Sequence, residues 1–236
     1  MKDINAPHII EWIESLNPDV IFCFGWSSLI KSELLNLTKI GVIGFHPTEL
    51  PKNRGRHPLI WAIVLGLEQT ATTFFFMGEG ADDGDILSQS SLSINYEDDA
   101  STVYGKIEES AIGQIEKFLP DLENGTYNRI SQDHSLSNSW RKRGIKDGEI
   151  DFRMSSYAIY NLVRGLTKPY IGAHLFYNDQ EVKVWKVKEE ETRLSNLEPG
   201  KILEVGNGEI LVKTYDKAIR ILEHNFQTLP TKGEYL

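Results

Sequence analysis

The sequence predicts an α/β domain with a parallel sheet, followed by a small β-rich domain. Over the first ~120 residues, short apolar runs alternate with helical patterns, which is typical of a parallel α/β sheet. From residue 173 onward, short alternating strands are joined by hairpin turns. Hydrophobic residues make up 40% of the 236 positions, which is enough for a core without a disulfide framework.

In the first half, apolar residues at helical spacing predict helices, and continuous apolar runs predict strands buried on both faces. The expected helices span 7–16, 27–36, 57–66 and 101–119. The expected strands span 20–24, 40–45, 70–77 and 86–94. Pro18 ends the first helix, and Pro58 lies near the start of the third, where proline is tolerated.

In the second half, one helix precedes a series of strands. The helix is expected at 155–166, and the strands at 173–178, 181–187, 200–205, 209–215 and 217–224. Residues 178–180 and 206–208 read as hairpin turns. We therefore divide the chain into a catalytic α/β domain at 1–125, a polar linker at 126–150, and a β-rich domain at 151–236.

Composition limits the classes of function. The formal net charge is −9, which argues against a nucleic-acid backbone as the main partner. No apolar run approaches the ~20 residues that a membrane span needs, and the N-terminus does not read as a signal peptide. The single cysteine, Cys23, suits a reducing cytoplasm and reads as a buried strand thiol rather than a nucleophile. We expect a cytoplasmic protein.

Chemistry-bearing residues follow three of the predicted strands. His46 follows the strand 40–45, the segment Phe24-Gly25-Trp26 lies at the end of the strand 20–24, and Asp82 lies in the turn after 70–77. Because ligands bind beyond the carboxyl ends of parallel strands, we expect these residues to converge at one sheet edge. A lone histidine without a close-spaced ligand pair disfavours a metal. A histidine with a carboxylate suits proton transfer and charge stabilisation.

Two motifs carry a family resemblance. "HPTELPKNRGRHPLIWAI", followed by "GADDGDILSQ", resembles the 10-formyltetrahydrofolate-dependent formyltransferases. The family pattern is Asn-x-His at a strand end, a Leu-Pro-x-x-Arg-Gly loop, and Asp-x-Gly-Asp. His46, the loop 50–55 and Asp82 match these elements. The segment from "WRKRGIKDGEIDF" onward resembles the β-rich second domain of the same proteins, so the resemblance covers nearly the whole chain.

The resemblance implies an enzyme with a Rossmann-like sheet. Within the family, the nucleotide-sugar N-formyltransferase branch fits best, and an acidic, short chain suits it better than tRNA. The implied reaction transfers formyl from N10-formyltetrahydrofolate, without a metal, to an amino-deoxy sugar linked to dTDP or UDP, for lipopolysaccharide or O-antigen biosynthesis. A homodimer is an expectation. Alternatives are a methionyl-tRNA formyltransferase, a formyltetrahydrofolate hydrolase-like enzyme, or an impaired binding remnant.

The resemblance also implies roles for individual residues. The expected catalytic residues are His46 as oxyanion donor and Asp82 as proton acceptor, with Gly44 at the position of the family asparagine. Expected folate contacts are Phe24, Gly25, Trp26, Gly80, Ala81 and Asp82. Expected substrate contacts are Pro47, Thr48, Arg54, Gly55 and Arg56.

Several of these residues have a structural alternative. Arg54 and Arg56 could pair a pyrophosphate or a carboxylate of the protein itself. Trp26 could flank the pterin ring or pack in the core, whereas Asp83 and Asp85 read as turn-forming residues.

The chain departs from the family at two places. Gly44 offers no side-chain donor, and the loss of such a donor typically costs ~2.7–4 kcal/mol in barrier. Family members open with an extra strand–helix–strand portion before the segment that matches residues 2–24. We therefore expect an N-terminally shortened formyltransferase fold.

Overall fold

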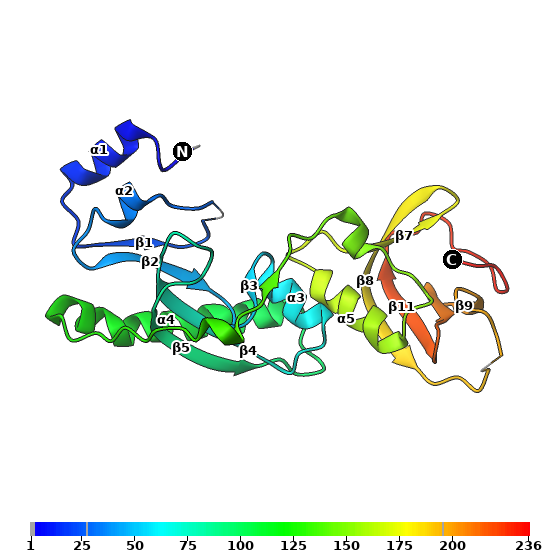
Figure 1. Ribbon diagram of the computed structural model, residues 1–236. Coiled ribbons are helices and arrows are strands. Elements are labelled where there is room, and N and C mark those ends of the chain that lie inside the picture. Colours follow the sequence, from blue (N-terminus) through cyan, green and yellow to red (C-terminus); the bar gives the residue numbers. More distant parts are fainter. Residues whose placement is uncertain (1–2, 27, 195) are drawn as a thin grey trace. The chain divides into compact units, whose positions relative to one another are not determined.

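The computed structural model describes residues 3–26, 28–194 and 196–236 and divides into two compact units (Figure 1). The first unit comprises Met1–Pro58, Gln69–Ser93 and Gly105–Lys142. The second comprises Leu59–Glu68, Ile94–Tyr104 and Arg143–Leu236. Both units draw on the N-terminal half of the sequence.

The first unit is built on a four-stranded mixed sheet in the order β1-β2-β4-β5. Its strands are β1 (Val20–Cys23), β2 (Gly41–His46), β4 (Gln69–Phe76) and β5 (Ile86–Ser93). Only β1 and β2 run parallel; β2–β4 and β4–β5 are antiparallel. The α/β class is confirmed, but the expected parallel arrangement holds only for β1 and β2. Strand β4 enters antiparallel to β2, and the turn between β4 and β5 then forms a hairpin.

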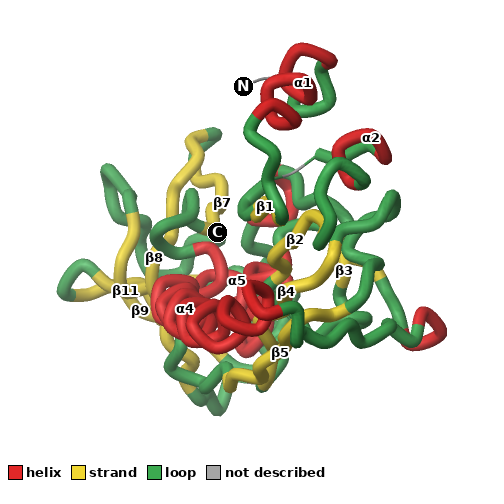
Figure 2. Tube along the Cα trace, turned by 90° about the vertical axis from the view of Figure 1, so that its left-hand side faces the viewer, coloured by secondary structure: helices red, strands yellow, loops and turns green. Residues whose placement is uncertain are grey.

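Helices cover both faces of this sheet. On one face, Phe118 of α4 (Ala100–Asn124) packs on Phe74, with ring centroids 5.0 Å apart. Figures 1 and 2 both draw α4 alongside the sheet. On the other face, Ile13 of α1 (Pro7–Ser15) and Leu34 of α2 (Ser32–Leu35) pack around Val42. Side chains alternate along a strand, so Gly44 and His46 share this second face.

The helix expected at 27–36 is shorter in the structure. Residue 27 lies outside the described part, and α2 begins only at Ser32. The side chain of Asn5 explains the late start: its Oδ1 accepts from the Lys31 backbone N–H at 2.8 Å, and its Nδ2 donates to the Leu29 carbonyl at 3.1 Å. These bonds satisfy the backbone in an extended form, which competes with the helix.

Part of the expected linker is built into the first unit. Residues 130–140 contain the 3-10 turn η1 (His134–Leu136) and the short strand β6 (Ser139–Trp140). Strand β6 pairs in parallel with β3 (Arg54–Gly55). The remaining helix that starts in this unit, α3 (Pro58–Val64), runs into the second unit. Within the described ranges, none of the helices combines the length and the apolarity needed to cross a membrane.

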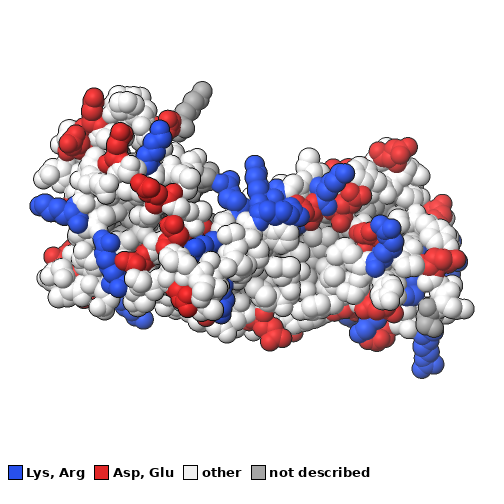
Figure 3. Space-filling model, viewed as in Figure 1, with Lys and Arg blue, Asp and Glu red and all other residues white. Residues whose placement is uncertain are grey.

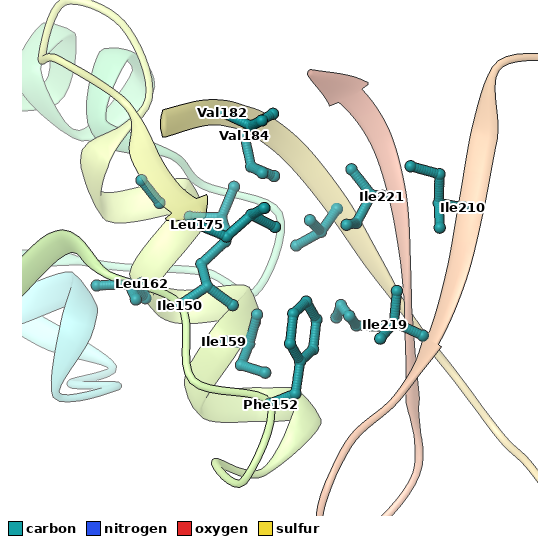
Figure 4. Packing of buried hydrophobic residues seen from close by; sticks show 14 of the residues in the cluster. Ile150, Phe152, Ile159, Leu162, Leu175, Val182, Val184, Ile210, Ile219 and Ile221 are labelled. Carbon is teal, nitrogen blue, oxygen red and sulfur yellow. The ribbon is translucent and has the colours of Figure 1, made fainter. Parts of the chain in front are cut away.

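The second unit is an antiparallel sheet packed on a helix, as expected from its strand pattern. Its strands are β7 (Ala173–Tyr177), β8 (Gln180–Glu190), β9 (Ile202–Gly206), β10 (Glu209–Lys213) and β11 (Ala218–His224), in the order β7-β8-β11-β10-β9. Helix α5 (Ser156–Leu166) follows the 3-10 turn η2 (Ile145–Gly148) and shares a core with the sheet (Figure 4). Asn178, Asp179, Asn207 and Gly208 have positive φ, which tight hairpin turns require.

Candidate functional site

His46, the last residue of β2, has both ring nitrogens facing polar groups. Its Nε2 lies 2.9 Å from the Asn53 carbonyl oxygen, and its Nδ1 lies 3.6 Å from Asp82 Oδ2. A carbonyl oxygen only accepts, so the Nε2 proton is fixed toward Asn53. Protonation at Nδ1 then gives an imidazolium that faces a carboxylate. The His46 side chain is only 6% exposed, which strengthens this interaction relative to one in water.

Asp82 reaches His46 by a route that the strand pattern does not predict. Because β4 is antiparallel to β2, Phe76 at its carboxyl end pairs with Ile43, and His46 pairs with Thr73. The end of β4 is therefore not at the His46 edge. The turn after β4 folds back and carries Asp82 to the histidine. The convergence of His46 and Asp82 is correct, but the strand-edge reason given for it is wrong for β4.

Two glycines shape the backbone around Asp82. A Cβ on Gly84 would overlap the Phe76 carbonyl oxygen, and one on Gly55 would overlap the Trp140 carbonyl oxygen. Gly55 also has a φ of +99°, which side chains rarely adopt. Its N–H donates to Asp82 Oδ2 at 2.9 Å. Glycine at both positions allows the close backbone approach that fixes the carboxylate.

Gly44 is buried, and its neighbours fill the space above it. An ideal Cβ at this position would lie 2.9 Å from Met77 Cγ and 3.0 Å from the Phe75 ring. Real Cβ atoms essentially never come within 3.0 Å of another heavy atom, so a side chain at residue 44 requires Met77 to shift and the Phe75 ring to give by a few tenths of an ångström. The packing is therefore built for glycine at the position where the family pattern has asparagine.

The expected folate contacts lie in two places: Phe24, Gly25 and Trp26 at the end of β1, and Gly80 and Ala81 in the Asp82 turn. The half-exposed ring of Phe24 packs on Phe74 at 5.4 Å and Phe45 at 6.4 Å, on the face opposite His46. Trp26 packs into the cluster around Val42, with its indole N–H unpartnered. Gly25 has a φ of +67°. Gly80 and Ala81 are exposed in the Asp82 turn, where the Asp83 carboxylate lies against Gly80. Cys23 lies in β1, as expected, but is only partly buried, and this burial raises the pKa of its thiol.

The expected substrate contacts lie in the loop after His46. Thr48 is fully buried and donates to the Lys52 carbonyl at 3.1 Å, while the Pro47 carbonyl accepts from Thr70. Arg54 is also buried. Its Nη2 donates to Gln132 Oε1 at 2.6 Å and lies 3.0 Å from His134 Nδ1, and its Nε has no partner. The Arg56 backbone N–H donates to the Trp140 carbonyl.

Two residues outside the expected set contact this loop and the Asp82 turn. Gln132 donates through Nε2 to the Asp82 carbonyl at 3.0 Å and to the Gly84 carbonyl at 2.6 Å. Asn138 Oδ1 accepts from the Asn53 N–H at 2.8 Å. Both belong to the segment interpreted as a linker. Hydrophobic periodicity could not have found them, because they lie in irregular backbone whose bonds are long-range.

This arrangement suits acyl transfer. The His46–Asp82 pair offers a proton acceptor beside a group that becomes cationic on protonation, next to backbone held at fixed positions. Across the described part of the chain, no group of three or more histidine, cysteine or acidic side chains gathers in a way that could hold a metal ion.

Comparison with known proteins identifies two matching family models. The formyl transferase model matches residues 2–116, and the model for the formyl transferase C-terminal domain matches residues 145–231. The methionyl-tRNA formyltransferase of Caldanaerobacter subterraneus subsp. tengcongensis is 33% identical over 219 residues, which cover 93% of this chain and 70% of the relative. The bifunctional polymyxin resistance protein ArnA of Wigglesworthia glossinidia brevipalpis is 35% identical over 187 residues, which cover 79% of this chain and 29% of ArnA.

Solved structures share the fold. HypX from Aquifex aeolicus superposes with a TM-score of 0.74 at 20% identity, covering 97% of this chain and 41% of HypX. The N-formyltransferase from Helicobacter canadensis, in complex with folinic acid and dTDP-3-aminofucose, superposes with a TM-score of 0.67 at 20% identity, covering 86% of this chain and 73% of that chain. The chain thus spans less than half the length of HypX and less than a third of the length of ArnA.

Proposed function

Because the chain belongs to the formyl transferase family, we propose that it moves a formyl group from N10-formyltetrahydrofolate to the amine of a nucleotide-linked amino sugar. The observation that carries the proposal is the buried His46 whose Nδ1 faces Asp82 at 3.6 Å. On this proposal the product serves surface polysaccharide synthesis, such as that of lipopolysaccharide O-antigen, in the cytoplasm, and the enzyme is a homodimer.

The proposed chemistry is a balanced acyl transfer. The neutral amine of the sugar attacks the formyl carbon, a C–N bond forms, and the carbonyl oxygen becomes an oxyanion. Asp82 takes the proton that the amine sheds. Protonated His46 stabilises the oxyanion from Nδ1, because its Nε2 proton is already donated to Asn53. Collapse breaks the bond to N10 of the folate, and N10 leaves with the proton from Asp82.

Charge and fold relationships support a sugar acceptor. The chain carries 34 acidic and 25 basic residues, so its overall balance is acidic. On the face in Figure 3, one group of Lys and Arg lies near the middle and the two signs are mixed elsewhere. A tRNA ligand favours clustered Lys and Arg. The Helicobacter canadensis enzyme, which shares the fold, was solved with dTDP-3-aminofucose. For dTDP or UDP in this chain, Arg56 is the proposed phosphate contact, since Arg54 is buried.

Methionyl-tRNA is the second candidate acceptor. A relative with 33% identity over 93% of this chain is a methionyl-tRNA formyltransferase, so the same pair of residues could serve a different amine. The two acceptors differ in salt dependence: tRNA binding weakens steeply as salt rises, whereas a small sugar nucleotide carries only two phosphates.

One assay separates the candidates. The protein is incubated with N10-formyltetrahydrofolate and, in parallel, with dTDP- and UDP-linked amino sugars, methionyl-tRNA, or water alone. A gain of one formyl group on a sugar nucleotide supports the proposal. Formyl-methionyl-tRNA supports the second candidate. Folate turnover without an acceptor indicates a hydrolase, and folate binding without turnover indicates an impaired binding protein.

A further inference from the structure

The segment 130–140, which we name the strap, bonds to both pieces of backbone that carry the site. At its start, Ile130 exchanges two backbone hydrogen bonds with Ile86, just after the Asp82 turn. At its end, Asn138 and Trp140 accept from the backbone N–H groups of Arg54 and Arg56. The strap therefore links the Asp82 turn to the loop that contacts both His46 and Asp82.

Gln132, in the middle part of the strap, contacts both the Asp82 turn and the loop through its side chain. It is 7% exposed, and both the nitrogen and the oxygen of its amide form hydrogen bonds. Nε2 donates its two protons to the carbonyls of Asp82 and Gly84, and Oε1 accepts from Arg54. The Gly55 N–H, next to Arg54, then donates to Asp82 Oδ2. Gln132 thus closes a ring of contacts through Arg54 and Gly55 back to the Asp82 carboxylate.

The chemistry of the ring favours glutamine over other polar residues. Two carbonyls require two donors, and the arginine requires an acceptor, so only a primary amide satisfies all three from one side chain. Each buried carbonyl left without a donor would carry a desolvation penalty, so the turn would move to find one.

We infer that Gln132 is a positioning residue that sets the orientation of the Asp82 carboxylate toward His46 Nδ1. It touches no reacting atom itself and acts through the backbone of residue 82. As far as catalysis is concerned, this inference rests on the proposed formyl transfer. The geometric part, that Gln132 controls the His46–Asp82 contact, stands independently of the reaction.

The experiment compares five variants of the full chain in the formyl-transfer assay. Gln132→Met removes donors and acceptor at similar volume, and Gln132→Glu keeps the acceptor for Arg54 but loses the two donors. Ser131→Ala is the matched control, because Ser131 lies on the same strap and its exposed hydroxyl bonds Asp85. Asp82→Asn alone and Asp82→Asn/Gln132→Met together test coupling. Circular dichroism checks that each variant folds.

We expect Gln132→Met and Gln132→Glu to lower kcat at least tenfold while KM for the folate changes less than threefold, and Ser131→Ala to change neither. In the Asp82→Asn background, adding Gln132→Met should change the residual kcat less than twofold, because the positioned carboxylate is already gone. Equal losses in both backgrounds would show a merely structural role and overturn the inference.

A second readout does not need turnover. The ring ¹⁵N resonances of His46 should move in Gln132→Met in the same direction as in Asp82→Asn, and stay in place in Ser131→Ala. If the wild-type protein formylates no amine but these shifts appear, the proposed function fails and the positioning role stands. If the shifts are absent in both folded Gln132 variants, the positioning role fails.

Discussion

At the scale of single residues, the hydrogen bonds that His46 and Asp82 already form decide which of their atoms can contact a ligand. His46 Nε2 is committed to Asn53, and one carboxylate oxygen of Asp82 is committed to Gly55. That same oxygen, Oδ2, faces His46 Nδ1 at 3.6 Å. On the proposed mechanism, Nδ1 and the Asp82 carboxylate, whose side chain is 20% exposed, are the groups that take part in the reaction.

Asp82→Asn keeps the size of the side chain but removes the proton acceptor. Because a general base typically contributes about 10²–10⁴-fold, we expect kcat to fall by roughly that factor. Folate affinity, measured by fluorescence titration, should change little, since the amide still accepts from the Gly55 N–H. Normal turnover in a correctly folded Asp82→Asn protein would contradict the assignment.

Gly44→Asn tests whether the packing around Gly44 leaves room for the asparagine that the family pattern has at this position. Because Met77 and Phe75 occupy the space, we expect the substitution to lower the free energy of unfolding by about 1–3 kcal/mol, as overpacking does. Combining it with Met77→Ala should recover part of that loss relative to Met77→Ala alone. Urea unfolding measures all three variants. An equally stable Gly44→Asn single variant would show that the neighbours yield without cost.

At the scale of elements, the turn between β4 and β5 is the part that brings Asp82 to its partner. Gly84→Ala places a Cβ against the Phe76 carbonyl, so the turn must shift. We expect a loss of about 1–3 kcal/mol in stability and a fall in kcat.

The matched control is Gly113→Ala in α4, where a Cβ meets nothing within 4 Å. In a helix interior this change should stabilise the protein by up to about 1 kcal/mol. Losses of equal size in both variants would contradict the argument.

The pairing of β8 and β11 gives a prediction for pH. Arg220 bonds both carboxylate oxygens of Glu190, at 2.7 and 3.0 Å. The hydrogen bond from Arg220 lowers the pKa of Glu190, which more than offsets the opposing effect of burial. A carboxylate with a lowered folded-state pKa adds stability above its unfolded pKa, and this stability is lost as the pH falls through the folded pKa.

We therefore expect Glu190→Gln to lower the free energy of unfolding by about 0.2–1 kcal/mol at pH 7. The difference from wild type should shrink as the pH falls below about 4.3, the ordinary glutamate value. Urea unfolding at pH 7, 5 and 4 measures it. Glu223→Gln is the control, because Glu223 and Lys186 are 3.9 Å apart and both well exposed. A difference that grows toward acid pH would contradict the sign.

Elements with strong periodicity could be predicted from the sequence, whereas strand directions and the strap could not. The bounds of β2, α5 and the five C-terminal strands follow apolar patterns, and the family resemblance from the His46 and Asp82 motifs is confirmed. The antiparallel course of β4 depends on how the chain returns after α3, which periodicity does not encode. The contacts of Gln132 join residues about 50 positions apart in sequence and leave no local pattern.

At the scale of the whole molecule, neither structural unit is one continuous stretch of the sequence. The second unit takes Leu59–Glu68 and Ile94–Tyr104 from the N-terminal half. Within that unit, Ile60 belongs to the core cluster of α5 and the antiparallel sheet. Tyr96 stacks on Tyr160 at 4.6 Å, and its hydroxyl donates to Glu189 at 2.9 Å. Burial, and then this bond, raise the pKa of Tyr96. A cut between residues 142 and 143 removes all of these contacts.

We therefore expect the fragment 143–236 to be less stable than the same region in the full chain. Loss of Ile60 alone removes a large apolar side chain from the core, which costs about 2–5 kcal/mol when such a residue is truncated to alanine. Arg164, which is buried, would also lose the carbonyls of Asn95 and Asp98 as acceptors. Urea unfolding followed by amide NMR compares the fragment with the full chain.

Since the charged Arg164 would be left with Asn161 as its remaining hydrogen-bond partner, Arg164→Met should recover part of the loss in the fragment while destabilising the full chain. A fragment that unfolds at the same urea concentration as this region of the full chain would mean that the two N-terminal segments add nothing to its stability.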